Sequence, residues 1–198
     1  MTFNPQPVLL ESRHVRLEPL TPGHAPALLA AANSADIFRY MIIPPFGSVG
    51  DVEAWINEAL AAQRASTEVP FATVRRSDGR AVGSTRFLDI RRAHRGLEIG
   101  WTWLAPEAQR TAINTEAKYL MFRQAFEGWG ALRVQLKTDA NNARSRAAIE
   151  RVGAKFEGVL RKHMLRPHDG YERDSAMFSI VESEWPAAKA KLEGMLDR

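Results

Sequence analysis

The sequence contains no cysteine among its 198 residues. That absence excludes a thiolate nucleophile, a disulfide framework and a cysteine-ligated zinc site. No apolar run approaches the roughly 20 residues that a membrane-spanning helix needs. The N-terminus lacks the basic start and long apolar stretch of a signal peptide. We therefore expect a soluble cytoplasmic protein with no membrane partner.

A strong charge of one sign is also missing. The chain has 27 basic and 23 acidic residues, a formal net charge of +4, and both signs are interspersed. This excess favours an anionic ligand such as a nucleotide but is too small to indicate a specific nucleic-acid partner. The five histidines show no paired metal-ligand spacing, so we predict no metal.

Periodicity predicts an α+β protein that forms a single domain over residues 1–198. Apolar and polar residues alternate in segments that predict strands at 14–20, 70–75, 81–90, 97–104, 132–138, 154–165 and 171–181. Helical spacing predicts helices at 26–33, 51–64, 115–127, 142–152 and 184–196. This order predicts a mixed, largely antiparallel central sheet with helices on both faces.

The stretch from residue 97 to 123 changes from strand to helix through a polar turn. Gly100 lies in the middle of the strand, where glycine often marks a bulge or a close backbone approach. Asn114 and Thr115 are expected to open the helix, with Glu116 in its first turn. A strand followed by a turn and a helix N-terminus presents free N–H groups and a positive dipole end, so we expect a phosphate site here.

Four segments resemble the GNAT superfamily of acyl-CoA-dependent N-acyltransferases, and more closely its RimJ/RimL-like branch. They read HVRLEPLTPGHAPAL, LEIGWTWL, QRTAINTEAKYLMFRQAF and NNARSRAAIERVGAKFEGVLR. The resemblance covers about residues 8–185 and implies the GNAT fold, acetyl-CoA as co-substrate and transfer of an acetyl group to an amine.

The resemblance also implies which residues bind acetyl-CoA. Backbone groups of Trp101, Thr102 and Trp103 would hold the pantetheine and the acyl carbonyl. The loop that would bind pyrophosphate comprises Gln109, Arg110, Thr111, Ala112, Ile113, Asn114 and Thr115. The alternatives are an apolar strand face shared by Trp101 and Trp103 with Leu97 and Ile99, and an ordinary surface turn.

Two loop positions depart from the family pattern. Ala112 and Asn114 stand where glycines are common in the family. Glycine permits positive φ and close approach to phosphate, whereas asparagine tolerates left-handed φ better than most residues. We therefore expect reduced acetyl-CoA affinity or a reshaped loop.

Two residues near the start of the helix at 142–152 have two interpretations. The resemblance implies that Asn142 contacts acetyl-CoA and that Ser145 donates a proton to the leaving thiolate. No tyrosine, which many members use, lies between Asn141 and Gly153. The alternative is that Asn142 and Ser145 only cap the helix.

Glu98 is the candidate general base. Strict alternation would place it on one strand face with Gly100 and Thr102. The alternative is a structural glutamate paired with an arginine such as Arg86. No histidine is evident beside the site. A weak carboxylate base suits an α-amine, with a pKa of about 7.7–8.0, better than a lysine amine at about 10.4.

These observations favour an acetyl-CoA-dependent N-acetyltransferase that acts on a primary amine, either a protein N-terminal α-amine or a small-molecule amine. Direct attack in a ternary complex is expected because no cysteine can carry the acyl group. One alternative is a non-catalytic acyl-CoA-binding or regulatory module with the same fold. Another is an RNA- or ribosome-associated protein that uses the basic loops. Exposed edge strands make a homodimer plausible.

Overall fold

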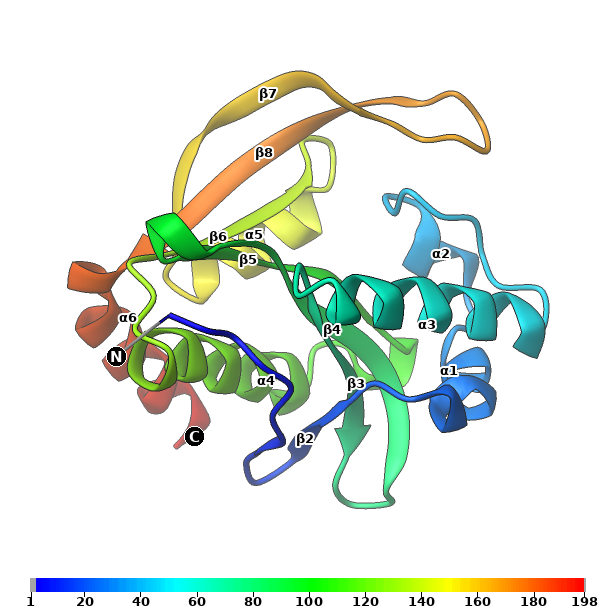
Figure 1. Ribbon diagram of the computed structural model, residues 1–198, viewed down its shortest axis with the longest axis horizontal. Coiled ribbons are helices and arrows are strands. Elements are labelled where there is room, and N and C mark those ends of the chain that lie inside the picture. Colours follow the sequence, from blue (N-terminus) through cyan, green and yellow to red (C-terminus); the bar gives the residue numbers. More distant parts are fainter. Residues whose placement is uncertain (1–2, 198) are drawn as a thin grey trace.

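One eight-stranded sheet organises the protein. The computed structural model describes residues 3–197, so residues 1, 2 and 198 of the predicted domain lie outside the described part. The strand order is β1-β2-β3-β4-β5-β6-β8-β7, and neighbouring strands are antiparallel except for the parallel pair β5 and β6. The predicted mixed, largely antiparallel sheet is confirmed (Figure 1).

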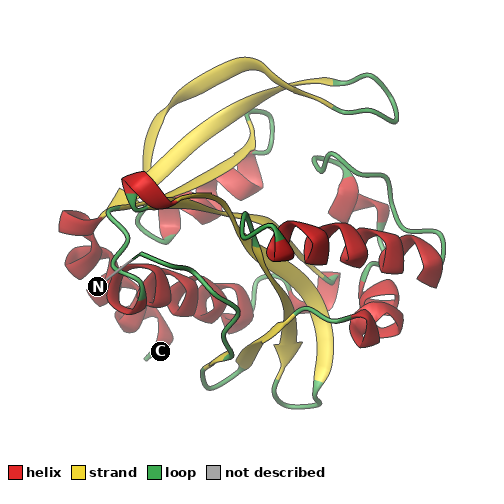
Figure 2. Cartoon of the chain, viewed as in Figure 1, coloured by secondary structure: helices red, strands yellow, loops and turns green. Residues whose placement is uncertain are grey.

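The secondary structure follows the predicted order closely (Figure 2). The strands are β1 (Leu10–Glu11), β2 (Val15–Pro19), β3 (Val69–Arg75), β4 (Arg80–Arg91), β5 (Gly96–Leu104), β6 (Arg133–Asp139), β7 (Lys155–Leu165) and β8 (Glu172–Val181). The helices are α1 (Ala25–Ala31), α2 (Ala35–Phe38), α3 (Val49–Arg64), α4 (Ala112–Arg123), α5 (Ala143–Arg151) and α6 (Trp185–Leu196). Sequence periodicity missed β1 and α2, which are too short to show a repeat. None of the helices within residues 3–197 has the length and apolar composition needed to cross a membrane.

Helices cover both faces of the sheet, as predicted. On β4 the Thr85 hydroxyl lies 3.5 Å from Met121 Sδ of α4. The next residue, Arg86, places its guanidinium 4.5 Å from the ring centroid of Trp55 on α3. Successive strand residues point to opposite faces, so α3 and α4 lie on opposite sides of the sheet.

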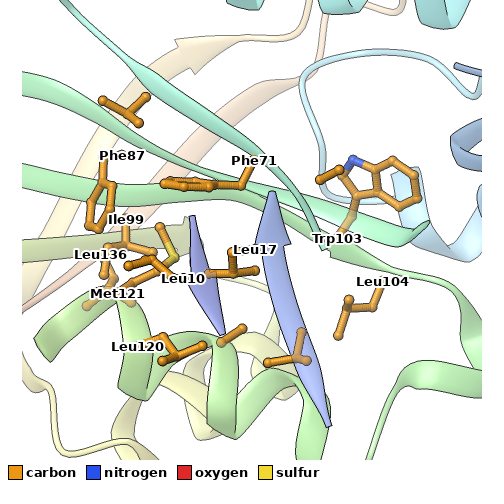
Figure 3. Close-up of a cluster of buried hydrophobic side chains, with 14 of the residues drawn as sticks. Leu10, Leu17, Phe71, Phe87, Ile99, Trp103, Leu104, Leu120, Met121 and Leu136 are labelled. Atoms are coloured by element: carbon orange, nitrogen blue, oxygen red, sulfur yellow. The ribbon is translucent and has the colours of Figure 1, made fainter. Parts of the chain in front are cut away.

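The hydrophobic core is formed where these helices meet the central strands. Figure 3 shows Phe71 and Phe87 from the sheet near Leu120 and Met121 from α4. All four side chains are buried. Burying a side chain of this size contributes about 1.5–3 kcal/mol, so the core fixes α4 against the sheet.

A β-bulge in β5 changes which side chains face each helix. Arg86 pairs with Gly100 and Ser84 pairs with Trp103, so β5 carries one extra residue between them. Trp101 accommodates it with φ 52°, and its ring lies 4.7 Å from the Arg86 guanidinium carbon. Gly100 indicated a bulge or a close backbone approach, and a bulge is present next to it.

The extra residue reverses the alternation that the sequence predicted. The ring centroids of Trp101 and Trp103 lie 6.5 Å and 6.4 Å from that of Trp55, on the face covered by α3. Thr102 instead accepts a hydrogen bond from Lys118 of α4. The predictions that Thr102 shares a face with Glu98, and that the two tryptophans share a face with Leu97 and Ile99, are therefore wrong.

Lys118 is a buried lysine that joins α4 to this strand. Its Nζ donates to the Thr102 hydroxyl at 2.6 Å and to the Thr85 hydroxyl at 3.5 Å. The residue is 7% exposed, and no carboxylate of residues 3–197 forms an ion pair with it. Burial lowers the pKa of Lys118 to about 7, because removing the ammonium from water disfavours its charged form.

This low pKa predicts a specific pH dependence of folding stability. Below pH 7 both folded and unfolded chains keep the Lys118 proton, and the cost of the buried charge is fully present. Between pH 7 and the ordinary lysine value of 10.5 only the unfolded chain keeps it, so stability rises by up to about 1.4 kcal/mol per pH unit. We expect Lys118→Met to remove this rise, measured by urea denaturation at pH 6.5, 7.5 and 8.5.

Lys191→Met is the matched control, because Lys191 is exposed on α6. That variant should keep the wild-type dependence on pH. Thr85 and Thr102 lie 2.8 Å apart through their hydroxyl oxygens, so they can satisfy each other when the lysine is removed. Identical pH slopes for wild type and Lys118→Met would show that Lys118 titrates normally.

Candidate active site

The parallel strands β5 and β6 pair over only three residues each. Their register joins Gly96–Glu98 to Arg133–Gln135, and no pairing follows although both strands continue. A cavity of about 670 Å³ borders both strands beyond this point. That volume lies within the usual range of small-molecule sites.

Most of the predicted site residues border this cavity. They are Glu98, Trp101, Thr102, Trp103, Gln109, Arg110, Thr111, Asn114, Asn142 and Ser145. Three predicted loop residues do not border it. Ile113 is buried in the core, whereas Ala112 and Thr115 border a second cavity of about 410 Å³.

Helix α4 begins one turn earlier than predicted. Thr111 is its N-cap, and the Thr111 hydroxyl accepts a hydrogen bond from the Ile113 N–H at 3.3 Å. The predicted opening at Asn114 and Thr115 is therefore wrong. The first turn of the helix borders the cavity at Asn114.

The left-handed position of the loop is Arg110, with φ 60°. Ala112 and Asn114 both lie within α4 and neither has positive φ. The absence of glycine at these two positions therefore imposes no backbone strain. Such strain falls on Arg110, where an L-residue in this conformation costs about 1–3 kcal/mol.

Glu116 lies in the first turns of α4, but its carboxylate binds backbone groups at the start of β2. Its Oε2 accepts hydrogen bonds from the backbone N–H groups of His14 at 2.8 Å and Val15 at 3.0 Å. The side chain is buried and joins α4 to the start of β2. The Glu116 carboxylate therefore has a structural role.

Asn142 and Ser145 have separate positions at the start of α5. Asn142 is the N-cap, and its Oδ1 accepts a hydrogen bond from the Ser145 backbone N–H at 3.0 Å. The predicted cap is therefore confirmed for Asn142. The cap uses the backbone of Ser145 and leaves its hydroxyl available at the cavity wall.

Glu98 is a buried carboxylate on the cavity wall, 1% exposed. Its Oε2 accepts hydrogen bonds from Gln135 Nε2 and Lys137 Nζ, both at 3.0 Å. Its Oε1 lies where a side chain at Gly100 would collide, because a Cβ there would come within 2.9 Å. Arg86 is not its partner but pairs with Glu68 at 2.9 Å.

Several charged residues around Glu98 were not expected from sequence. Lys137 and Arg173 border the same cavity from β6 and β8. His163 of β7 does not border the cavity, but partial burial and the charges of Lys137 and Arg173 lower its pKa. Alternation along residues 132–138 could have placed Lys137 on the polar face, but the register between distant strands could not be read.

The other end of the cavity has a basic rim. Arg110, Arg144 and Arg151 border it near the start of α4 and along α5. Arg144 donates from Nη1 to Gln109 Oε1 at 3.1 Å, which connects α5 to the loop before α4. Exposed cations beside a helix N-terminus suit a phosphate-bearing ligand.

Comparison with known proteins gives the family of this fold and site. Residues 14–155 match the acetyltransferase (GNAT) domain family. The chain is 30% identical over 112 residues to YdaF of Bacillus subtilis (strain 168), provisionally named a ribosomal N-acetyltransferase. This match covers 57% of the chain and 60% of YdaF, so the chain spans less than two thirds of that relative.

Solved structures agree with this match. A GCN5-related N-acetyltransferase from Brucella melitensis superimposes with a TM-score of 0.90 and 31% identity, covering 96% of this chain and 86% of the other. RimJ of Mycobacterium smegmatis, solved in complex with CoA-disulfide, has a TM-score of 0.83 and 22% identity, covering 96% and 95%. The similarity to RimJ concerns the fold alone. The chain belongs to the acetyltransferase (GNAT) domain family.

Proposed function

We propose that this protein transfers the acetyl group of acetyl-CoA to a primary amine by direct attack while both substrates are bound. The observation that carries this proposal is the cavity at the divergence of β5 and β6, which reaches from the loop before α4 to Glu98. Acetyl-CoA supplies the thioester that the amine attacks. The absence of cysteine favours direct transfer, because no thiolate can hold the acetyl group.

The residues of the cavity fit acetyl-CoA chemically. The start of α4 offers free N–H groups to a pyrophosphate, with Arg110, Arg144 and Arg151 nearby. Beyond Glu98, β5 no longer pairs with β6, so backbone groups near Trp101–Trp103 are suited to hold the pantetheine amides. Asn142 and Thr102 border the same space.

Glu98 is placed to accept the proton of the amine, directly or through water. Hydrogen bonds from Gln135 and Lys137 hold one oxygen and leave Oε1 for the substrate. The positive charges of Lys137 and Arg173 favour an amine that is already neutral. Deprotonating a lysine amine at neutral pH costs roughly 3–4 kcal/mol more than deprotonating an α-amine, so α-amines or other amines of low pKa are the favoured acceptors.

The Ser145 hydroxyl is proposed to donate a proton toward the departing thiolate. It borders the cavity and has no role in the α5 cap, which uses the backbone N–H. A thiol has a pKa of about 8.5, so its thiolate needs little acid assistance. A water held by Ser145 would serve the same purpose.

The test of the proposed function combines binding with turnover. We expect calorimetric titration to show micromolar binding of acetyl-CoA and weaker binding of dephospho-coenzyme A if a rim arginine meets the 3′-phosphate. Release of free thiol should then depend on an added amine. Binding without thiol release over a broad amine panel would instead support the non-catalytic acyl-CoA-binding alternative.

Replacing Glu98 with glutamine tests the general base. We expect Glu98→Gln to lower kcat/KM at pH 7 by about 100-fold, within the usual range for general-base catalysis. The loss should shrink as pH rises, because more acceptor amine is then neutral in solution. Steady-state assays from pH 6 to 9 would measure this change, and acetyl-CoA affinity should stay within about threefold.

Glu157→Gln is the matched control for this change. Glu157 pairs with Arg133 on the same sheet but does not border the cavity. Its variant should keep the wild-type pH–rate profile. An unchanged profile in Glu98→Gln would remove Glu98 as the base.

Replacing Ser145 with alanine tests the proton donor without disturbing the cap. Alanine keeps the backbone N–H that Asn142 binds, so thermal stability should not change. We expect kcat to fall about tenfold or more while acetyl-CoA affinity is retained. In contrast, Asn142→Ala should lose about 1 kcal/mol of stability. Wild-type turnover in Ser145→Ala would show that the hydroxyl has no catalytic role.

A further inference from the structure

Arg173 is a buried cation on the cavity wall that has no partner. The residue lies on β8, is 9% exposed and borders the same cavity as Glu98. Within residues 3–197, no hydrogen bond or ion pair to its guanidinium is present, and Nε is buried without an acceptor. Arginine stays charged at neutral pH, and leaving such a charge buried and unpaired is unfavourable. The side chain is therefore suited to an anionic ligand.

Each of the two anions nearest to Arg173 is engaged by other groups through one oxygen, and Asp139 Oδ2 is buried without a hydrogen-bond partner. Glu98 and Asp139 both attract Arg173 through space. Glu98 accepts from Gln135 and Lys137 through Oε2. Asp139 Oδ1 accepts from the Asn141 N–H at 2.8 Å and from the Tyr171 hydroxyl at 3.4 Å. Neither carboxylate forms an ion pair with the arginine.

The charges on this part of the wall and next to it are balanced. Lys137 and Arg173 are positive and Glu98 is negative on the wall. Asp139 is negative and lies next to the wall, close enough to attract Arg173 through space. Partial burial and the two cations lower the pKa of His163, which favours its neutral form. A ligand of one sign gains little from such a wall. A ligand with an amine beside Glu98 and an anionic group beside Arg173 satisfies both.

Side chains from the segment after α2 and from β7 also line this cavity. Tyr40, Met41 and Ile42 border it after α2, and Met164 borders it from β7. The loop between β7 and β8 is joined to the end of α2, because Arg166 donates a hydrogen bond from Nη1 to the Arg39 carbonyl at 2.7 Å. Figure 1 shows the β7–β8 hairpin arching toward α2. A charge-assisted pair is stronger for a group that is largely buried, and Arg173 is 9% exposed.

We propose that Arg173 binds a carboxylate of the acceptor, so that the preferred acceptors are amines with a carboxylate a few bonds away. This inference rests on the proposed acetyl transfer. Two sources share this chemistry: the α-carboxylate of a free amino acid, and the side chain of an acidic residue at a peptide N-terminus. In both, the amine faces Glu98 and the carboxylate forms a bidentate pair with the guanidinium.

The test compares acceptors that differ only in the carboxylate. The pairs are glycine with glycinamide, and an Asp-Ala amide with an Asn-Ala amide. Because glycine and glycinamide differ in amine pKa, the diagnostic quantity is the ratio of wild-type to variant kcat/KM for each acceptor. We expect Arg173→Gln to lower kcat/KM about 10- to 100-fold for a carboxylate acceptor, mainly through KM, and less than threefold for its amide.

Two further variants separate recognition of the carboxylate by Arg173 from a general structural effect of replacing an arginine. Arg173→Lys keeps a positive charge and should retain part of the preference. Arg161→Gln changes an exposed arginine on β7 and should leave every ratio unchanged. If Arg173→Gln does not fold, two other measurements test the role of Arg173. They are the preference of the wild type for the Asp peptide over the Asn peptide and the kcat/KM ratios of Arg173→Lys.

The outcomes distinguish the sources and the possible failures. A preference only for glycine indicates free amino acids, and one only for the Asp peptide indicates acidic N-termini. If Arg173→Gln lowers kcat/KM equally for the carboxylate acceptor and its amide, or if only acceptors without a carboxylate are acetylated, the proposed role of Arg173 is wrong. The proposed acetyl transfer then still stands. If the wild type acetylates no amine, the proposed function fails. Titration with N-acetylglycine and N-acetylglycinamide then tests the site: binding of the acid that Arg173→Gln abolishes supports it, and no difference overturns it.

Discussion

The early end of the pairing between β5 and β6 is the constraint on which the site depends. A fully paired sheet would consume the backbone groups of both strands and leave no space between them. Here pairing stops after Glu98 and Gln135, and the cavity occupies the divergence. The bulge at Gly100–Trp101 adds to this by turning Thr102 toward α4 and both tryptophans toward α3.

Arg86 and Lys118 support this irregular strand from its two faces. Arg86 contacts the rings of both Trp55 and Trp101 and pairs with Glu68. Lys118 bonds Thr102 from the opposite side. A positive φ at a tryptophan persists only when its surroundings determine it, and two buried basic side chains with different partners provide such surroundings.

The two ends of the cavity differ in electrostatic character, and this difference indicates which substrate binds at each end. The end near α4 combines exposed arginines with a helix N-terminus, which suits phosphates. The other end combines a held carboxylate, Glu98, with Lys137 and Arg173, which suits a neutral amine that carries an acidic group. The proposed acetyl transfer would take place between them, near the bulge and Ser145.

The sequence alone determined the order and type of nearly all elements, the sheet class, the bulge near Gly100 and the cap at Asn142, because these follow from local periodicity and turn chemistry. Strand alternation placed Glu98 among the candidates, and the resemblance to the GNAT superfamily placed Ser145 there. Local pattern could not decide the faces beyond the bulge, since one extra residue reverses every later side chain. Nor could it pair Glu98 with Lys137, bury Lys118 or leave Arg173 unpartnered. Those features depend on which distant strands become neighbours, and only the tertiary structure decided that.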